Sequence, residues 1–238
     1  MKKELCIITT SFLIILFNFT YAQISSGGTP PSTIFEIKSN PDPVLLPEFD
    51  IQAMLDEDEI RMQTKAAPYR FAKAFTINKN TENSGEWTTL PNGDKIWRIS
   101  FKSEQAKSLN IIFNNYHLPE KASLFIYNPD KTFILGAFTS FNNKSGKVLP
   151  TSPVPGDQII VEYYEPKKVD FHGAFNIKQV AHDYRGIISL NKDGNFGNSG
   201  SCNVDINCPD GDNWQLEKHS VARILMNGTG LCTGALIN

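Results

Sequence analysis

Residues 85–102 read GEWTTLPNGDKIWRISFK, and this stretch decides the fold that we expect. It carries an Asn92-Gly93 pair between two segments in which apolar and polar side chains alternate. Such a pair between two β-type segments is a strong signal for a β-hairpin. We therefore expect residues 86–90 to pair with residues 95–99.

Working outward, the region from 69 to 188 contains eight short β-type segments separated by turns. They cover residues 71–77, 85–90, 95–102, 108–116, 123–127, 133–138, 158–164 and 171–180. Regular spacing without long helical periods is typical of an all-β fold, here a jelly-roll-like β-sandwich. Its core is expected to hold Trp87, Trp97, Phe101, Phe113, Phe125, Tyr127, Phe133 and Phe138. These rings could alternatively form a carbohydrate-binding platform, but their alternation along strands favours burial.

The first 22 residues have the pattern of a secretory signal peptide. Basic residues at positions 2 and 3 precede an apolar run at 5–19, and small residues end at Ala22, so cleavage is expected between Ala22 and Gln23. A membrane anchor is less favoured because a spanning helix needs roughly 20 apolar residues. The protein is thus expected in the periplasm or outside the cell, with no membrane partner after cleavage.

Residues 23–68 are expected to form a leader ahead of the sandwich. Its first part, to about residue 47, is rich in Gly, Pro and Ser and should lie extended over a neighbouring surface. Residues 49–62 could form a short amphipathic turn or helix. They include the acidic run 56–59, for which a solvated acidic face is favoured over a calcium site because the ligand spacing of a calcium loop is missing.

The charge pattern excludes several classes of partner. The chain has 23 basic and 25 acidic residues, scattered without a basic stripe, so neither nucleic acid nor an anionic membrane surface is expected as a partner. The histidines show no metal-binding spacing, and no metal or cofactor is expected. They are His117, His172, His182 and His219. His182 and Asp183 are adjacent and could orient each other, although surface or structural roles are favoured for all four histidines.

The last segment, residues 197–238, contains Cys202, Cys208 and Cys232. In an exported chain three thiols cannot pair completely, so either one stays free or their partners lie beyond Asn238. Residues 221–225 and 231–237 flank an Asn-Gly turn and predict a second hairpin. A lone hairpin is marginal in water, so this one must pack against the preceding domain or against strands outside this chain.

The motif GNSGSCNVDINCPDGD at 197–212, followed by CTGALIN at 232–238, is similar to the start of the mature domain of the lysyl endopeptidase family of secreted bacterial serine proteases. Segments 85–87, 94–99, 118–122, 156–159 and 180–186 more loosely resemble the prosequence of that family. The resemblance implies that each of the three cysteines bonds to a cysteine further along the chain. It also implies a prodomain that assists folding of a trypsin-like double β-barrel and keeps it silent.

The same resemblance implies that the Ser-His-Asp triad lies past the C-terminus, so no catalytic residue is expected in this chain and its own enzymatic activity is left open. Residues 189–196 are expected to form a processing linker cut between Phe196 and Gly197. Phe196 stands where a self-processing lysine-specific enzyme would have Lys, and Lys192 is the nearest alternative cut.

We thus expect the amino-terminal part of a protease precursor, whose partners are its own catalytic domain and the peptide substrates of the whole enzyme. The alternatives are a secreted β-sandwich binding module and a protease-like interaction protein with a degenerate triad.

Overall fold

The computed structural model describes residues 25–63, 67–188 and 206–236. Strands account for 42% of the structure against 17% for helices, which confirms the all-β class. The predicted signal peptide at 1–22, with Ala22 and Gln23, and the predicted linker at 189–196 lie outside the described residues.

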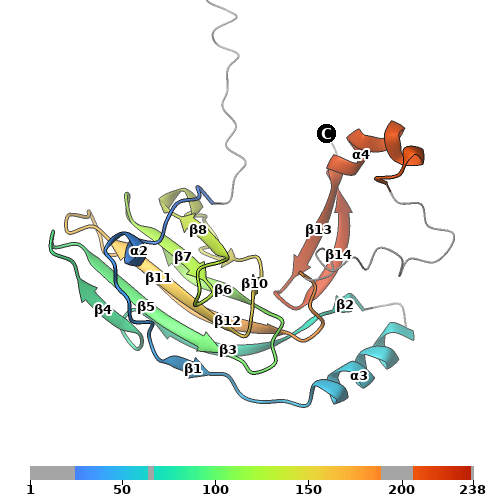
Figure 1. Ribbon diagram of the computed structural model, residues 1–238, viewed down its shortest axis with the longest axis horizontal. Helices are drawn as coiled ribbons and strands as arrows, with labels where there is room; N and C mark the ends of the chain where they lie inside the picture. The colour runs from blue at the N-terminus through green and yellow to red at the C-terminus, as the bar shows by residue number, and fades with distance from the viewer. Residues whose placement is uncertain (1–24, 64–66, 189–205, 237–238) are drawn as a thin grey trace, which may run out of the picture.

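Two sheets face each other and form a sandwich (Figure 1). The six-stranded sheet runs β1 (Pro43–Leu45), β5 (Lys95–Lys102), β11 (Gln158–Glu165), β7 (Ser123–Tyr127) and β8 (Ile134–Phe138), and β4 (Glu86–Thr89) also pairs with β5. The five-stranded sheet runs β10 (Val154–Pro155), β6 (Ser108–His117), β12 (Ala174–Asp183) and β3 (Ala72–Asn80), and β9 (Leu149–Pro150) also pairs with β6.

All eight predicted strands form, with ends shifted by up to three residues. The predicted 92–93 hairpin forms, but its register differs by one residue from the predicted pairing of 86–90 with 95–99. Glu86 lies opposite Arg98 and Thr89 opposite Lys95, where the prediction puts Ile99 and Leu90. Within these strands, side chains of one parity point inward, so the core between the sheets collects the residues that alternate along β5, β6, β7, β11 and β12. Phe133, one of the predicted core aromatics, packs against this main cluster. Four others lie within it: Trp97, Phe101, Phe113 and Phe138.

The prediction that Trp87 belongs to the core is wrong. Its side chain is 43% exposed, because β4 is an edge strand that pairs only with β5. The ring still points to the inner side of the sheet, where it meets Tyr163 edge-on at 6.1 Å. Strand alternation alone predicts the face of a residue, and the position of its strand within the sheet then decides whether that face is covered.

The outer face of the six-stranded sheet is covered by residues 25–39. Phe125 and Tyr127 are buried there in a second cluster with Ala137 and Ile160. The covering segment is tied down by the Ser32 N–H, which donates to the buried Glu162 carboxylate at 2.7 Å. The expected leader therefore does lie over a neighbouring surface. It is not extended throughout, because it contains the short helix α2 (Pro31–Ile34). Its later part, strand β1, pairs parallel with β5.

The predicted helix at 49–62 is α3 (Ile51–Gln63), which leads to the two-residue strand β2 (Tyr69–Arg70). Figure 1 shows α3 beside the ends of the sheets rather than on a sheet face. In the described ranges of the chain, no helix is both long and apolar enough to cross a membrane.

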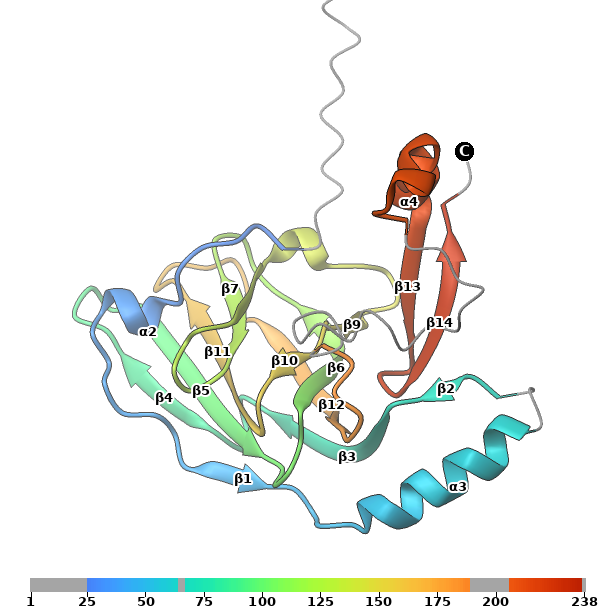
Figure 2. The ribbon, with the colours of Figure 1, turned by 45° about the vertical axis from the view of Figure 1, so that its right-hand side comes forward.

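The C-terminal segment contains η3 (Pro209–Trp214), α4 (Gln215–Ser220) and the strands β13 (Val221–Met226) and β14 (Gly230–Ala235). The two strands form the predicted hairpin, and its loop has Asn227 and Gly228 in the left-handed region of backbone conformation. β14 also pairs with β2, so the hairpin becomes part of a three-stranded sheet beside the sandwich (Figure 2). No sheet among the described residues closes into a barrel.

Candidate functional site

Strand β2 offers a sheet edge to the C-terminal hairpin. It pairs antiparallel with β14 at Gly230 and Leu231. Directly after β2, the backbone N–H of Phe71 donates to the carbonyl oxygen of Thr229 at 2.8 Å. Main-chain hydrogen bonds of this kind give strand addition its affinity. We call the contact between β2, β12 and the hairpin the hairpin-docking site.

A separate apolar cluster lies between the sandwich and the hairpin at the hairpin-docking site. From the sandwich side it contains the buried Phe71, Ala72, Ala181 and Ile187, with Leu225 and Leu231 of the hairpin packed against them. Burying one leucine side chain contributes roughly 1.5–3 kcal/mol. Leu225 and Leu231 are partly buried, so each contributes less than this, in addition to the backbone pairing of a hairpin that would be marginal alone. Of the two packing arrangements considered for this hairpin, the structure has the one against the preceding domain.

The hairpin loop rests on the outer face of the five-stranded sheet. The Gln179 side chain on β12 donates to the carbonyl oxygen of Asn227 at 3.0 Å. Gly228 has φ +73°, and a Cβ placed there would lie 2.8 Å from Nδ2 of Asn110. This close approach needs a residue without a side chain. Asn110 is 2% exposed, and its Oδ1 has no hydrogen-bond partner in the structure.

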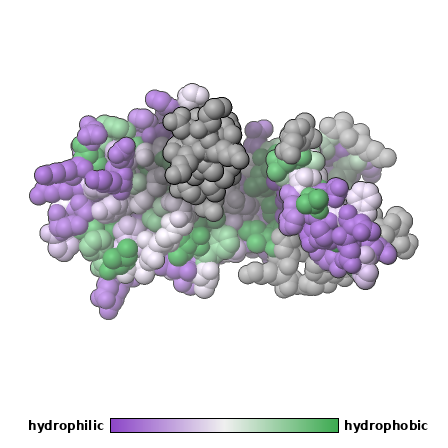
Figure 3. Space-filling view, turned by 90° about the horizontal axis from the view of Figure 1, so that it is seen from above, coloured by the Kyte–Doolittle hydropathy of each residue, from purple (hydrophilic) through white to green (hydrophobic). Residues whose placement is uncertain are grey.

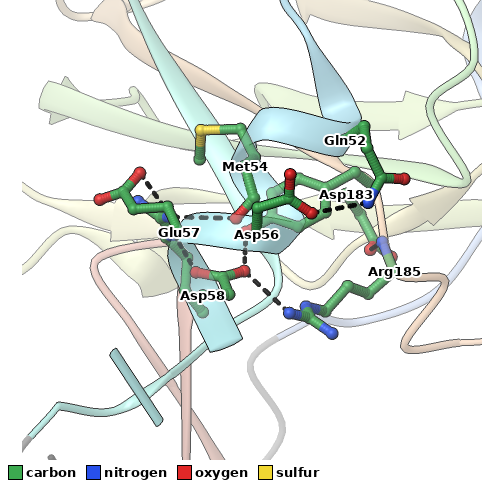
Figure 4. Close-up of polar contacts among 9 residues, drawn as sticks. Gln52, Met54, Asp56, Glu57, Asp58, Asp183 and Arg185 are labelled. Carbon is green, nitrogen blue, oxygen red and sulfur yellow. Dashed lines mark hydrogen bonds and ion pairs between the residues drawn. The ribbon is translucent and has the colours of Figure 1, made fainter. Parts of the chain in front are cut away.

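Helix α3 is attached to the hairpin-docking site through Asp58 (Figure 4). Asp58 accepts hydrogen bonds from Nε of Arg70 at 2.7 Å, from Nη2 of Arg185 at 2.9 Å and from the Tyr184 hydroxyl at 2.7 Å. Burial alone would raise the pKa of Asp58, but the hydrogen bonds from Tyr184, Arg185 and Arg70 together lower it. Because Arg70 belongs to β2, the carboxylate of Asp58 holds the strand that receives the hairpin.

The prediction that the acidic run 56–59 is a solvated face is wrong for Asp58, which is 3% exposed. Asp56, Glu57 and Glu59 are exposed as predicted. The sequence gives no periodic signal for the burial of Asp58, because its partners Arg70 and Arg185 lie 12 and 127 residues away in the chain. Glu57 adds an exposed ion pair to Arg70 at 3.0 Å.

Asp183 fixes the path by which the chain leaves the sandwich. Its buried carboxylate accepts from the Ser108 hydroxyl at 2.6 Å and from the backbone N–H groups of Arg185, Gly186 and Ile187 at 2.7–3.0 Å. Ile187 is thereby held in the apolar cluster, and its carbonyl oxygen accepts from Nη1 of Arg223 on β13 at 3.1 Å. Ile187 is 2% exposed, in keeping with its place at the end of the predicted sandwich region 69–188.

His182 and Asp183 do not orient each other through a hydrogen bond. Nδ1 of His182 lies 2.7 Å from Oγ of Ser103, whereas the Asp183 carboxylate binds the turn that follows it. Burial lowers the pKa of His182 to about 4, so its ring is neutral near pH 7. Ser103 is 3% exposed, and both side chains line a pocket of about 120 Å³ next to Leu46 and Phe49.

The other histidines are dispersed. His117 stacks on Phe171 with the ring centroids 4.6 Å apart, Nδ1 of His172 lies 2.8 Å from the Glu165 carboxylate, and His219 is exposed on α4. Across the described ranges, no three His, Cys, Asp or Glu side chains come close enough together to hold a metal ion.

Two of the three predicted disulfide cysteines can be located. Cys208 precedes η3 and Cys232 lies on β14; both are exposed free thiols in this structure. Cys202, Phe196 and Gly197 lie outside the described residues. The expected bonds to cysteines beyond Asn238 stay a prediction.

A comparison with known protein families gives a match on the segment that contains the hairpin. The family model described as lysyl endopeptidase, C-terminal domain, matches residues 196–238. The C-terminal segment is related to the lysyl endopeptidases. No solved structure matches the chain. The relationship therefore rests on this segment, and the sandwich is interpreted from its own contacts.

Proposed function

We propose that this chain is the amino-terminal region of a secreted serine endopeptidase precursor. In this proposal the sandwich is a prodomain that holds the first hairpin of the catalytic domain, assists its folding and restrains it until cleavage. The complete catalytic domain would hydrolyse peptide bonds with a Ser-His-Asp triad supplied by residues beyond position 238.

The observation that carries the proposal is the pairing of β2 with β14. The strand that receives the hairpin precedes the sandwich, whereas the hairpin belongs to the segment that is similar to lysyl endopeptidase. Backbone pairing, the apolar cluster around Phe71 and the Gln179 hydrogen bond all act on the same hairpin. A prodomain that templates a catalytic domain needs a contact of this kind, since an isolated hairpin does not stay folded.

Apolar residues on the hairpin and on the short helices before it give further support. Figure 3 shows this part of the chain as a lobe beside the sandwich, with hydrophobic residues among hydrophilic ones. A cavity of about 440 Å³ lies between Ile206, Trp214 and Val221, and the side chain of Leu216 is 85% exposed. Clusters of exposed apolar side chains usually mark a surface that another structure covers. In a complete precursor, the remainder of the catalytic domain would cover this lobe.

The test begins with the coding sequence downstream of codon 238 and uses the full-length precursor that it encodes. Two matched substitutions separate docking from general damage, because Ala181 and Ala74 are cross-strand neighbours on the outer face of the five-stranded sheet. Ala181 is buried in the hairpin-docking site, and Ala74 is exposed. Ala181→Glu should strongly reduce the yield of mature peptidase, because it places a charge under the hairpin. Ala74→Glu should leave the yield unchanged.

The outcomes also separate the alternatives. A downstream sequence without His, Asp and Ser segments, or a full-length product that hydrolyses no peptide, would contradict the protease proposal and favour an interaction protein or a binding module. Equal maturation of the Ala181→Glu and Ala74→Glu precursors would refute the role of the sandwich while leaving the protease proposal in place.

A further inference from the structure

A polar pocket lies at the end of the sandwich opposite to the hairpin-docking site. Its volume is about 150 Å³, and its lining includes Asn80, Asn115 and Asn176. Along β6 and β12, Asn114 pairs with Asn176 beside this pocket, whereas Asn110 pairs with Ala181 near the hairpin. The pocket is therefore separate from the contact on which the proposed protease function rests.

The carboxamide side chains of the pocket have donor and acceptor atoms that no described residue uses. Nδ2 of Asn176 donates to Oδ1 of Asn114 at 2.7 Å and more weakly to Asn78, so its Oδ1 stays without a partner in the described part of the chain. Oδ1 of Asn80 accepts two backbone N–H groups of the following loop, which leaves its amino group. Asn115 is exposed, and its side chain makes no hydrogen bond to any described residue.

The loop that forms one wall is held in place before any ligand arrives. The backbone N–H of Asn80 donates to Oδ1 of Asn83 at 2.9 Å, and Nδ2 of Asn83 donates to the carbonyl oxygen of Asn78 at 3.1 Å. Ser84 adds a hydrogen bond to the carbonyl oxygen of Asn80. A pocket wall fixed in this way loses little conformational entropy on binding.

Two exposed aromatic rings, outside the lining itself, are joined to residues that line the pocket. The indole N–H of Trp87 donates to the carbonyl oxygen of the lining residue Thr81 at 3.1 Å, which fixes the ring and leaves it 43% exposed. The lining residue Ala174 pairs with His117, whose ring stacks on Phe171. Phe171 is 40% exposed. The indole ring of Trp87 thus offers an apolar surface beside a group of amides.

We propose that this pocket binds a neutral saccharide. Carboxamides donate to and accept from the hydroxyl groups of a sugar at the same time, and the apolar C–H surface of a sugar ring packs on an aromatic face. No basic side chain lines the pocket and Glu82 is its one charged lining residue, so an anionic sugar would find no counter-charge. Because the pocket and the hairpin-docking site lie at opposite ends, the sandwich binds a saccharide and the hairpin simultaneously.

The test titrates the full 238-residue chain with cellohexaose, xylohexaose, mannohexaose and chitohexaose. Calorimetry gives the dissociation constant, and tryptophan fluorescence is recorded in a Trp214→Phe background, because Trp214 is 57% exposed on the C-terminal lobe. Trp87 and Trp97 both emit in this background. We expect saturable binding of at least one probe, with a change in tryptophan emission that is absent when Trp87 is also replaced. Trp87→Ala should weaken that binding by about tenfold or more, the loss typical of an aromatic anchor.

Asn115→Gly provides a second variant that keeps the fold intact. Asn115 has φ +54°, a conformation that glycine adopts without strain, so the substitution removes the carboxamide alone. It should weaken binding, whereas Phe141→Ala, at an exposed aromatic outside the pocket lining, should not. The proposal would be overturned if no probe bound at about 1 mM, a concentration that detects even very weak binding. It would also be overturned if wild type, Trp87→Ala and Asn115→Gly bound equally well.

Discussion

Replacing Asp58 by Asn tests whether helix α3 holds the strand that receives the hairpin. The carboxylate accepts three hydrogen bonds of 2.7–2.9 Å, two of them from guanidinium groups. Asn keeps one acceptor oxygen and loses the charge. Removing one partner of a fully buried ion pair costs about 3–5 kcal/mol. Because the side chains of Arg70 and Arg185 are 18% and 19% exposed, water replaces part of the lost interaction, and we expect about 2–3 kcal/mol.

Urea unfolding followed by circular dichroism measures this loss, and amide hydrogen exchange locates it. Exchange should accelerate in β2 and at Gly230 and Leu231, since β2 is paired with the hairpin there. The matched control is Asp56→Asn on the same helix, an exposed position bonded to Gln52, which should change stability by less than about 0.5 kcal/mol. Equal unfolding free energies for the Asp58 and Asp56 variants would refute the reasoning.

The pH dependence gives an independent check. The pKa of Asp58 is lowered by folding, so its contribution is present above the pKa of the unfolded chain, about 3.9, and is lost as the pH falls through the folded pKa. Wild type and Asp58→Asn should therefore differ at pH 7 and converge in strong acid. A constant difference down to the lowest pH would show that the lost stability does not come from the charge.

Three further predictions concern single residues. Gly228→Ala should weaken hairpin docking by about 1–2 kcal/mol, because the new Cβ would meet Asn110. The loss is measured as faster amide exchange in β14. Gly146→Ala, with open space around the new Cβ, is the control. Asp183→Asn should lower the free energy of unfolding by about 2–4 kcal/mol in urea titrations, since a buried carboxylate with four hydrogen-bond donors loses its charge. In NMR titrations the His182 ring should stay neutral until about pH 4. The free energy of unfolding should fall as the pH drops from about 6.5 towards that value, because the unfolded chain binds the proton first. A measured pKa near 6.5 would contradict the burial of His182.

Local pattern predicts the strands of the sandwich because alternation and turn residues act within a few positions of each other. The Asn92-Gly93 pair predicts the hairpin from two adjacent residues, although the observed register is one residue away from the predicted one. The short strands β1, β2, β9 and β10 have two or three residues each and carry no usable period. Their partners determine them, which explains why none of them is among the eight predicted segments.

The candidate site is predicted less well, for the same physical reason. The hairpin at 221–235 follows from its turn and its apolar segments, but nothing in those residues identifies β2 as its neighbour. Asp58 looks like one member of an acidic run until Arg70, Tyr184 and Arg185 surround it. Long-range polar contacts of this kind depend on the complete fold, whereas the apolar periodicity of a strand is local.

Strand β14 is flanked by β13 on one edge, and by β2 on the other edge only at Gly230 and Leu231. Within the described residues, Cys232 to Ala235 have no partner on that second edge. A further strand can therefore pair first with Cys232 to Ala235 and then replace β2 at Leu231 and Gly230. Replacing β2 in this way removes only the backbone pairing, so release of the hairpin also requires loss of the apolar cluster around Phe71 and of the Gln179 hydrogen bond.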